Sequence, residues 1–283
     1  MNVIIGGPIS MGKIITVANH KGGVGKTTVA INLADALKHC DMFKVLLIDL
    51  DSQHNATDTF GAKIEDENTM VDVLKGYCTI EEAIQRMPMG DIVPGDDLLA
   101  SIQKELIRNL NDNELAYVLK NALNKVKDTY DYIIIDTSPA LDIYMEAALN
   151  AADECIIPIT AQKYAIDGLA NLMNTINYQK ENYNKNLELL GVLLNVYDRR
   201  LKMDRDVKDM LPEYGKMLNF NVLDTHIRIS QEIKNAQAIA DTVDEKGNKI
   251  VSNRSLFDNY PGSAAVQNYI NLVREIVLER RVV

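Results

Sequence analysis

The sequence of 283 residues has no tryptophan and only three cysteines, four histidines and four phenylalanines. The cysteines, Cys40, Cys78 and Cys155, are far apart and form no CxxC pair, so the usual spacing of zinc or iron–sulfur ligands is missing. Such cysteines are typical of reduced thiols, and we expect a cytoplasmic protein. The chain also lacks the run of about 18 apolar residues that a membrane-spanning helix needs.

Two further absences exclude classes of catalytic site and limit the ways in which the protein could bind nucleic acid. The chain contains no G-x-S-x-G nucleophile motif and no H-E-x-x-H zinc motif. Positive charge is also scarce, because 30 lysines and arginines stand against 40 acidic residues, for a formal net charge of −10. Any contact with nucleic acid must therefore come from a local basic patch.

Apolar runs rich in β-branched residues alternate with helical patterns, and no long linker separates them. The clearest runs are 14–18, 45–49, 132–136, 154–159 and 189–194. Continuous apolar strands between helices indicate a parallel sheet covered on both faces. We predict one α/β domain over residues 11–283, with a mostly parallel sheet and helices on both faces. Residues 1–10 are a possible N-terminal extension.

Residues 20–28 read HKGGVGKTT and lie between an apolar strand and a helical pattern. The backbone N–H groups of such a loop converge on a phosphate, and the helix dipole adds its positive end. Lys26 would reach the outer phosphates of ATP, and the Thr27 hydroxyl would complete a Mg²⁺ shell. The other residues expected to bind the nucleotide are Gly22, Gly23, Val24, Gly25 and Thr28. The ordinary motif requires glycine where His20 stands, whereas a variant with an extra lysine, Lys21, fits completely.

This loop resembles the deviant Walker A motif of the ParA-type DNA-partition ATPases, within the superfamily that includes MinD. The resemblance implies a P-loop NTPase-like fold, hydrolysis of ATP with Mg²⁺, and a homodimer that forms on ATP binding. In that family the additional lysine, here Lys21, reaches across the dimer interface to a phosphate bound by the partner subunit. It would therefore act in catalysis together with Lys26.

Three acids lie at or just past predicted strand ends, beside the phosphate loop. Asp136 closes an apolar run like a Walker B acid and is expected to hold Mg²⁺, through a water or through Thr27. The alternative is that Asp136 caps the next helix. Residues 49–57, DLDSQHNAT, resemble the family's first switch, D-x-D-P-Q-x-N-A-T. The resemblance implies that Asp51 orients or activates the attacking water and that Asp49 shapes the Mg²⁺ environment.

The family binds adenine and DNA beyond the last strong strand. By that match Asn195 would contact the base, and Arg200 and Arg228 stand at two DNA-contacting positions. The full set of candidates for contact with DNA is Arg199, Arg200, Lys202, Arg228 and Lys234. Acidic residues interleave with the first of these, so a solvated helix face is the alternative. Contacts to phosphates would make the binding non-specific.

The resemblance covers about residues 11–240 and resumes near Leu256. It implies partition of DNA on the nucleoid, with a ParB-like centromere-binding partner that stimulates hydrolysis and no membrane attachment. One alternative is a MinD-like protein that cycles on membranes. Another is a nucleotide-gated scaffold that positions a different cargo.

Two segments near the C-terminus bear on these alternatives. The last helical pattern has one apolar stripe, which is expected to pack in the core rather than on a membrane. It consists of Val266, Tyr269, Ile270, Val273, Ile276 and Val277. Residues 241–255 are longer than the family's usual connection and predict a polar turn between two short strands. They form either a hairpin that contacts a partner or DNA, or an inert insertion.

Overall fold

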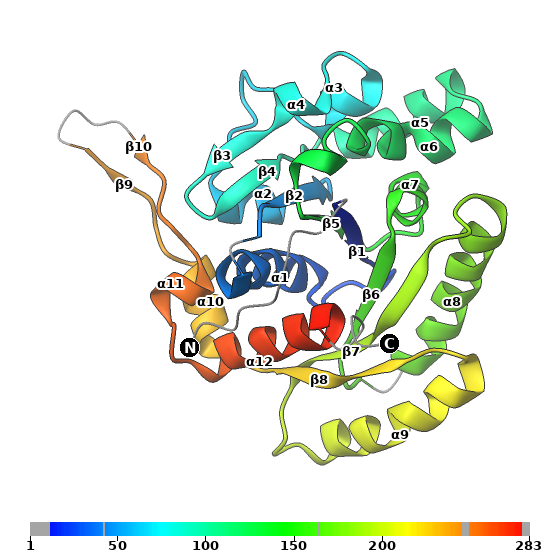
Figure 1. Ribbon diagram of the computed structural model, residues 1–283, viewed down its shortest axis with the longest axis vertical. Helices are drawn as coiled ribbons and strands as arrows, with labels where there is room; N and C mark the ends of the chain where they lie inside the picture. The colour runs from blue at the N-terminus through cyan, green and yellow to red at the C-terminus, as the bar shows by residue number, and fades with distance from the viewer. Residues whose placement is uncertain (1–11, 42, 163–164, 245–248, 279–283) are drawn as a thin grey trace.

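The computed structural model describes residues 12–41, 43–162, 165–244 and 249–278. Helices cover both faces of a central sheet (Figure 1). The possible N-terminal extension, residues 1–10, lies outside the described residues. The strands of the sheet are β1 (Lys13–Val17), β2 (Val45–Leu50), β3 (Gln85–Met87), β4 (Gly90–Val93), β5 (Tyr132–Thr137), β6 (Glu154–Ile159), β7 (Glu188–Tyr197) and β8 (Val222–Arg228).

The α-helices connect these strands and enclose the sheet. They are α1 (Lys26–Asp41), α2 (Asn55–Phe60), α3 (Met70–Lys75), α4 (Ile80–Ala83), α5 (Leu99–Asn109), α6 (Asp112–Leu123), α7 (Ile143–Ala151), α8 (Ala165–Asn182), α9 (Lys202–Leu218), α10 (Gln231–Gln237), α11 (Leu256–Asn259) and α12 (Ala264–Val273). A 3₁₀ turn, Lys127–Thr129, precedes β5, and a π-helical turn, Arg274–Leu278, continues α12.

The strand order is β3-β4-β2-β5-β1-β6-β7-β8, and every pair except β3–β4 is parallel. The prediction of a mostly parallel sheet is therefore confirmed. The phosphate loop follows β1, which lies between β5 and β6 near the middle of the sheet. Parallel pairing places Asp136 of β5 beside Val17 of β1 and beside Asp49 of β2. The predicted acids thus meet at one edge of the sheet.

The buried apolar side chains form one cluster on each face of the sheet. Helix α12 packs beside α1 on one of these faces. Its predicted stripe is confirmed as core, because five of the six residues are at most 5% exposed and Ile270 is half-buried. Among the described residues, no helix is both long and apolar enough to cross a bilayer.

A two-stranded arm projects from the body of the molecule beside α10 and α11 (Figure 1). Its antiparallel strands are β9 (Thr242–Val243) and β10 (Lys249–Ile250). The two short strands predicted within residues 241–255 are therefore confirmed, while residues 245–248 of the turn lie outside the described residues.

A buried carboxylate on α1 joins this helix to the segment around α11. Asp35 is 2% exposed, and both its carboxylate oxygens lie 2.9 Å from the hydroxyl of Ser255, which donates to them. The imidazole of His39 lies 3.0 Å from Asp35 through Nδ1 and 3.0 Å from Asp258 through Nε2. The hydrogen bond to Asp35 outweighs burial and raises the pKa of His39 to about 9. A charged histidine therefore holds the two segments together.

This junction predicts a pH-dependent loss of stability. The pKa of His39 is higher in the folded chain than its ordinary 6.5, so its contribution is fully present below pH 6.5 and is lost as the pH rises through 9. Because His39 is partly exposed, we expect His39→Gln to cost about 1 kcal/mol at the lower pH, or roughly 2–4 °C in Tm. Thermal unfolding of both proteins across this range should show their Tm values converging toward high pH. A Tm difference that is independent of pH would contradict the charged histidine.

Candidate active site

The loop between β1 and α1 has the backbone shape that its glycines allow. Gly23 and Gly25 have φ values of +75° and +83°, in the left-handed region that other residues rarely adopt. A Cβ atom on Gly25 would overlap Nδ2 of the buried Asn195, so a side chain at this position would displace Asn195. The N–H of Val29 donates to the Gly25 carbonyl at 2.9 Å and starts the helical ladder of α1. The loop therefore opens directly onto a helix N-terminus.

Two buried asparagines hold this loop from either side. Asn19 donates through its amide to the Pro158 carbonyl of β6 at 2.8 Å, and its Oδ1 accepts the N–H of Lys21 at 2.9 Å. Asn195 of β7 donates to the Val24 carbonyl at 2.8 Å. Sequence reasoning missed Asn19, although a polar residue directly after a buried strand was a signal. Asn195 contacts the loop, and its predicted contact with a base stays a prediction.

Lys26 lies under the loop and is only 6% exposed. Its ammonium donates to the Lys21 carbonyl at 3.2 Å. Burial lowers its pKa, whereas the charges of Asp136 and Asp51 act in the opposite direction. The ammonium therefore lies within electrostatic reach of two of the predicted acids, at the first residue of α1.

Asp136 is completely buried, and among the described residues no group meets full hydrogen-bond geometry with either of its carboxylate oxygens, although the Thr27 hydroxyl lies close enough to act on its pKa. Burial raises its pKa well above the usual range, and the negative charge of Asp49 acts in the same direction. The Thr27 hydroxyl and Lys26 oppose this rise. A buried carboxylate without a partner is costly, and carboxylate and hydroxyl oxygens are ligands that Mg²⁺ accepts. Asp136 and Thr27 therefore fit a Mg²⁺ ion.

The alternative function of Asp136 as a helix cap is wrong. Helix α7 is capped by Asp142, whose carboxylate accepts the N–H groups of Tyr144 and Met145, both at 3.1 Å. Asp136 belongs to β5 and does not cap this helix.

Asp49 differs from Asp136 because its carboxylate is fully engaged. It accepts the N–H of Asp51 at 3.1 Å, the N–H of Thr57 at 2.9 Å and the Thr57 hydroxyl at 2.7 Å. Burial still raises its pKa to about 6. The Thr57 hydroxyl in turn accepts the N–H of Gly95, where a Cβ would lie 2.9 Å from Asp49 Cγ. Asp49 therefore anchors the loop 49–57, while its predicted role near Mg²⁺ stays a prediction.

Asp51 lies in the turn that this anchor holds. It is 7% exposed, and its Oδ1 accepts the N–H of Gln53 at 3.0 Å. His54 follows in the left-handed conformation, with φ +40°, and its N–H donates to the Asp51 carbonyl at 2.9 Å. His54 Nδ1 lies 3.3 Å from Asp58 of α2, the helix that follows. The turn thus holds the side chain and the backbone carbonyl of Asp51 through one short-range hydrogen bond each.

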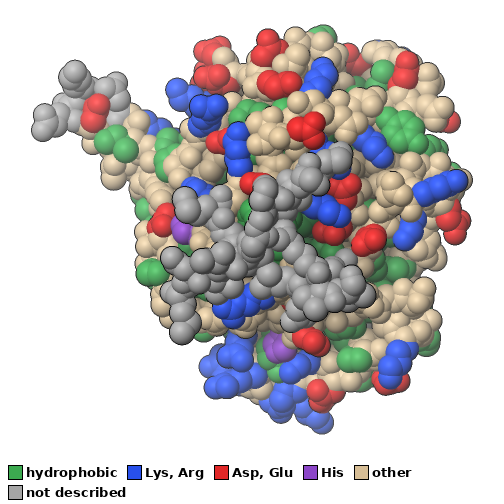
Figure 2. Space-filling view, in the orientation of Figure 1, with side chains coloured by type: hydrophobic (Ala, Val, Ile, Leu, Met, Phe, Trp, Pro, Cys, Tyr) green, Lys and Arg blue, Asp and Glu red, His purple; other side chains and the backbone are tan. Residues whose placement is uncertain are grey.

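Four of the predicted DNA-binding residues gather where β7 and β8 end, and we call Arg199, Arg200, Lys202 and Arg228 the basic region. The register pairs Tyr197 of β7 with Arg228 of β8, and all four basic residues are exposed. Lysine and arginine side chains are concentrated over this edge of the molecule (Figure 2). Arg200 pairs with Asp198 through Nη2 at 2.6 Å, which lowers the pKa of Asp198 to about 2. Lys234 lies separately on α10, where it is exposed.

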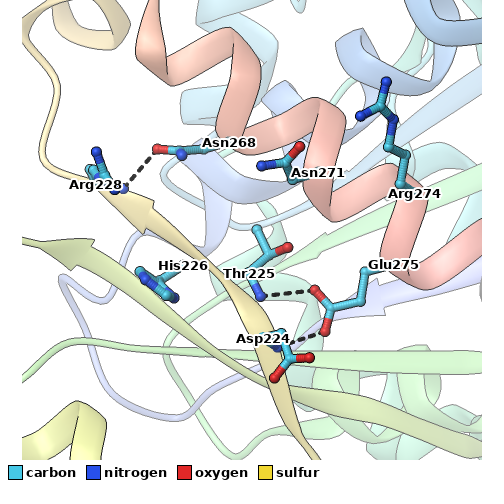
Figure 3. A pocket seen from close by; sticks show the side chains of 8 residues that line it. All are labelled: Asp224, Thr225, His226, Arg228, Asn268, Asn271, Arg274 and Glu275. Carbon is cyan, nitrogen blue, oxygen red and sulfur yellow. Dashed lines mark hydrogen bonds between the residues drawn. The ribbon is translucent and has the colours of Figure 1, made fainter. Parts of the chain in front are cut away.

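A polar pocket of about 350 Å³ lies beside Arg228, between β8 and α12 (Figure 3). Glu275 points toward β8 and accepts the N–H groups of Asp224 and Thr225 at 2.6 and 2.9 Å. Asn268 accepts the N–H of Arg228 at 3.2 Å. These side chains satisfy donors of a strand at the sheet edge, and Arg274 adds a second arginine to the pocket lining. The basic region is therefore continuous with a polar groove.

Comparisons with known proteins agree with this geometry. The family described as an AAA domain matches residues 12–189. The chain is 33% identical to the sporulation initiation inhibitor protein Soj of Bacillus subtilis, over 94% of this chain and 98% of Soj. It is 35% identical to the chromosome partitioning protein ParA of Caulobacter vibrioides, over 77% of this chain and 83% of that protein.

The solved structure of cobyrinic acid a,c-diamide synthase from Mycobacterium smegmatis with bound ADP and magnesium is also similar. It has a TM-score of 0.72 and 31% sequence identity, and the match covers 78% of this chain and 88% of that protein. The likeness places the chain among nucleotide-binding α/β proteins, and the match to Soj extends over more of its length.

The position of Lys26 predicts the effect of removing it. We expect Lys26→Ala to weaken ATP binding at least about tenfold, because a hydrogen bond to a charged group contributes roughly 1.5–3 kcal/mol. Titration calorimetry with ATP measures the change. Lys216→Ala is the matched control, because that lysine is 74% exposed on α9 and pairs with Glu213. Equal affinities for Lys26→Ala and the wild type would place the nucleotide elsewhere.

Proposed function

Since the chain belongs to the ParA/Soj family of ATPases, we propose that it partitions plasmid or chromosomal DNA through ATP-driven dimerisation and DNA binding. The observation that carries this proposal is the pairing of a two-lysine phosphate loop with the buried Asp136, which has no hydrogen-bond partner among the described residues. These groups suit a bound nucleoside triphosphate and its cation. The part of the proposal that concerns DNA partition is supported by the similarity to the partition proteins named above and by the basic region.

Each residue of the site has a separate role in the proposed hydrolysis of ATP. The loop amides bind the phosphates, and Lys26 neutralises charge at the outer phosphates. Asp51 orients the attacking water from its held turn. A Mg²⁺ ion bound near Asp136 and Thr27 would supply further neutralisation of phosphate charge. Positioning and neutralisation are the main requirements of phosphoryl transfer, so this set of groups is sufficient.

Lys21 is the residue that points to a dimer. Its backbone is engaged, because its N–H donates to Asn19 and its carbonyl accepts from Lys26. Across the described part of the chain, its ammonium forms no ion pair. We propose that this charge meets a phosphate bound by the second subunit when ATP closes the dimer.

The basic region supports the DNA step. Its four residues lie at the carboxyl edge of the sheet, the same edge as the phosphate loop, so a dimer closed on ATP presents two copies together. Arginine and lysine bind phosphates without reading sequence. In the proposed cycle, a ParB-like centromere-binding partner stimulates hydrolysis and releases the protein from DNA, within the nucleoid.

DNA binding across a salt series tests this proposal. We expect the wild type to bind duplexes of unrelated sequence more tightly with ATP than with ADP. Arg200→Ala and Arg228→Ala should weaken binding to every duplex and reduce the salt slope by about one for each lost phosphate contact. Fluorescence anisotropy measures the affinity for each duplex and its dependence on salt, with Lys216→Ala as the control. If the wild type hydrolyses ATP steadily but binds no DNA in its presence, the result would favour a scaffold that positions another cargo. If the wild type binds lipid vesicles with ATP, the result would favour a MinD-like cycle on membranes.

The role of Asp51 predicts a separation of binding from turnover. We expect Asp51→Ala to keep its affinity for ATP and to hydrolyse it about 10²-fold more slowly, because the water loses its orienting group. Phosphate release under saturating ATP measures turnover, and Asp209→Ala, on an exposed residue of α9, is the control. Undiminished turnover would remove Asp51 from the mechanism.

A further inference from the structure

The connection that carries the two-stranded arm returns to the body at Arg254, and this side chain is almost completely buried. Its exposed fraction is 9%. The guanidinium donates to the Thr59 carbonyl of α2 at 3.2 Å, to the Ile239 carbonyl at 2.8 Å and to the Asp241 carboxylate at 2.6 Å. All three nitrogens are therefore engaged, and one of them holds the last turn of α2.

The same connection packs against the end of α2. This helix ends at Gly61, with φ +70°, where a Cβ atom would overlap Cγ1 of Val251. That Cβ would also lie 3.3 Å from Nη1 of Arg254. The connection therefore lies directly on the C-terminus of α2, and this close approach favours glycine at position 61.

The residue after Arg254 holds the other helix of the site. Ser255 donates to Asp35 of α1, the helix that begins with the phosphate loop lysine. Consecutive residues thus bind α2 and α1. Between the two helices lies a pocket of about 530 Å³, whose lining includes Arg254, Thr59 and the first-turn residues Thr27 and Thr28 of α1.

The other end of α2 is attached to the catalytic loop. Thr57 bonds to Asp49, and the residue that precedes the helix, His54, bonds to the Asp51 carbonyl. With only six residues, α2 is too short to be stable by itself, so its contacts decide where it lies. A shift at its C-terminus is therefore transmitted to Asp51.

We propose that Arg254 is a positioning residue for ATP hydrolysis: together with Asp241 it fixes α2, and through α2 the Asp51 turn, against the phosphate loop. The inference rests on the proposed role of Asp51. It gives residues 241–255 a function in turnover that neither an inert insertion nor a contact surface would have. In this proposal Arg254 acts on turnover through Asp51 and not by contact with the reacting atoms.

The test compares kcat and KM for ATP in Arg254→Ala, Arg254→Lys and the wild type. We expect Arg254→Ala to lower kcat about tenfold with KM changed less than about twofold, because a displaced catalytic group affects turnover rather than binding. Arg254→Lys should recover part of kcat, since a lysine can pair with Asp241 but cannot bond to three acceptors in the same plane. Lys249→Ala is the matched control: this residue is 65% exposed, pairs with the same Asp241 and belongs to the arm.

A double-mutant cycle with Asp51→Ala distinguishes positioning from a general loss of structure. If Arg254 acts through Asp51, Arg254→Ala should not slow the residual hydrolysis of Asp51→Ala any further. Three outcomes would each overturn the inference. They are additive losses of kcat in the double mutant, an unchanged kcat in Arg254→Ala, and a parallel loss of ATP binding in both Arg254 variants. Full turnover by Asp51→Ala alone would instead overturn the proposed role of Asp51, which keeps the two failures apart.

Discussion

The active site depends on the burial of two carboxylates side by side at the carboxyl edge of the sheet. Asp49 and Asp136 occupy matching positions on β2 and β5, and both are completely buried. Burial raises both pKa values, and a neighbouring negative charge adds to each rise: that of Asp51 for Asp49 and that of Asp49 for Asp136. A fold can keep such a pair only if each charge meets a compensating group. The two acids meet this requirement in different ways, and the difference organises the site.

Asp49 is compensated from within the chain. Thr57 and the Asp51 N–H satisfy its oxygens, and this bonding bends residues 49–57 into the turn that holds Asp51. Asp136 has no such partner among the described residues, and the nearby charge of Lys26 acts on it. Asp49 therefore holds the loop 49–57 in place, whereas the Asp136 carboxylate has no such structural role among the described residues. The asparagines on either side of the phosphate loop then hold it against β6 and β7.

The arm extends this arrangement to a part of the chain that is remote in sequence. Arg254 and Ser255 connect α2 and α1, the helices that follow the Asp51 turn and the phosphate loop. Short elements such as α2 take their position from their neighbours, and these contacts give the site a defined geometry before a nucleotide binds.

The sequence predicted the five strands with continuous apolar runs, because burial on both faces leaves a clear pattern. It did not predict β3, β4 or β8, which lie toward the two edges of the sheet and are only partly buried. By itself the sequence determined the phosphate loop, since glycines at positive φ and a following helix are local properties of the chain. Only the tertiary structure decided that Asp49 bonds to Thr57, that Asp136 has no hydrogen-bond partner among the described residues and that Arg254 reaches Thr59. Arg254 and Thr59 are 195 residues apart in the sequence, and strand register and packing, rather than local pattern, decide such arrangements.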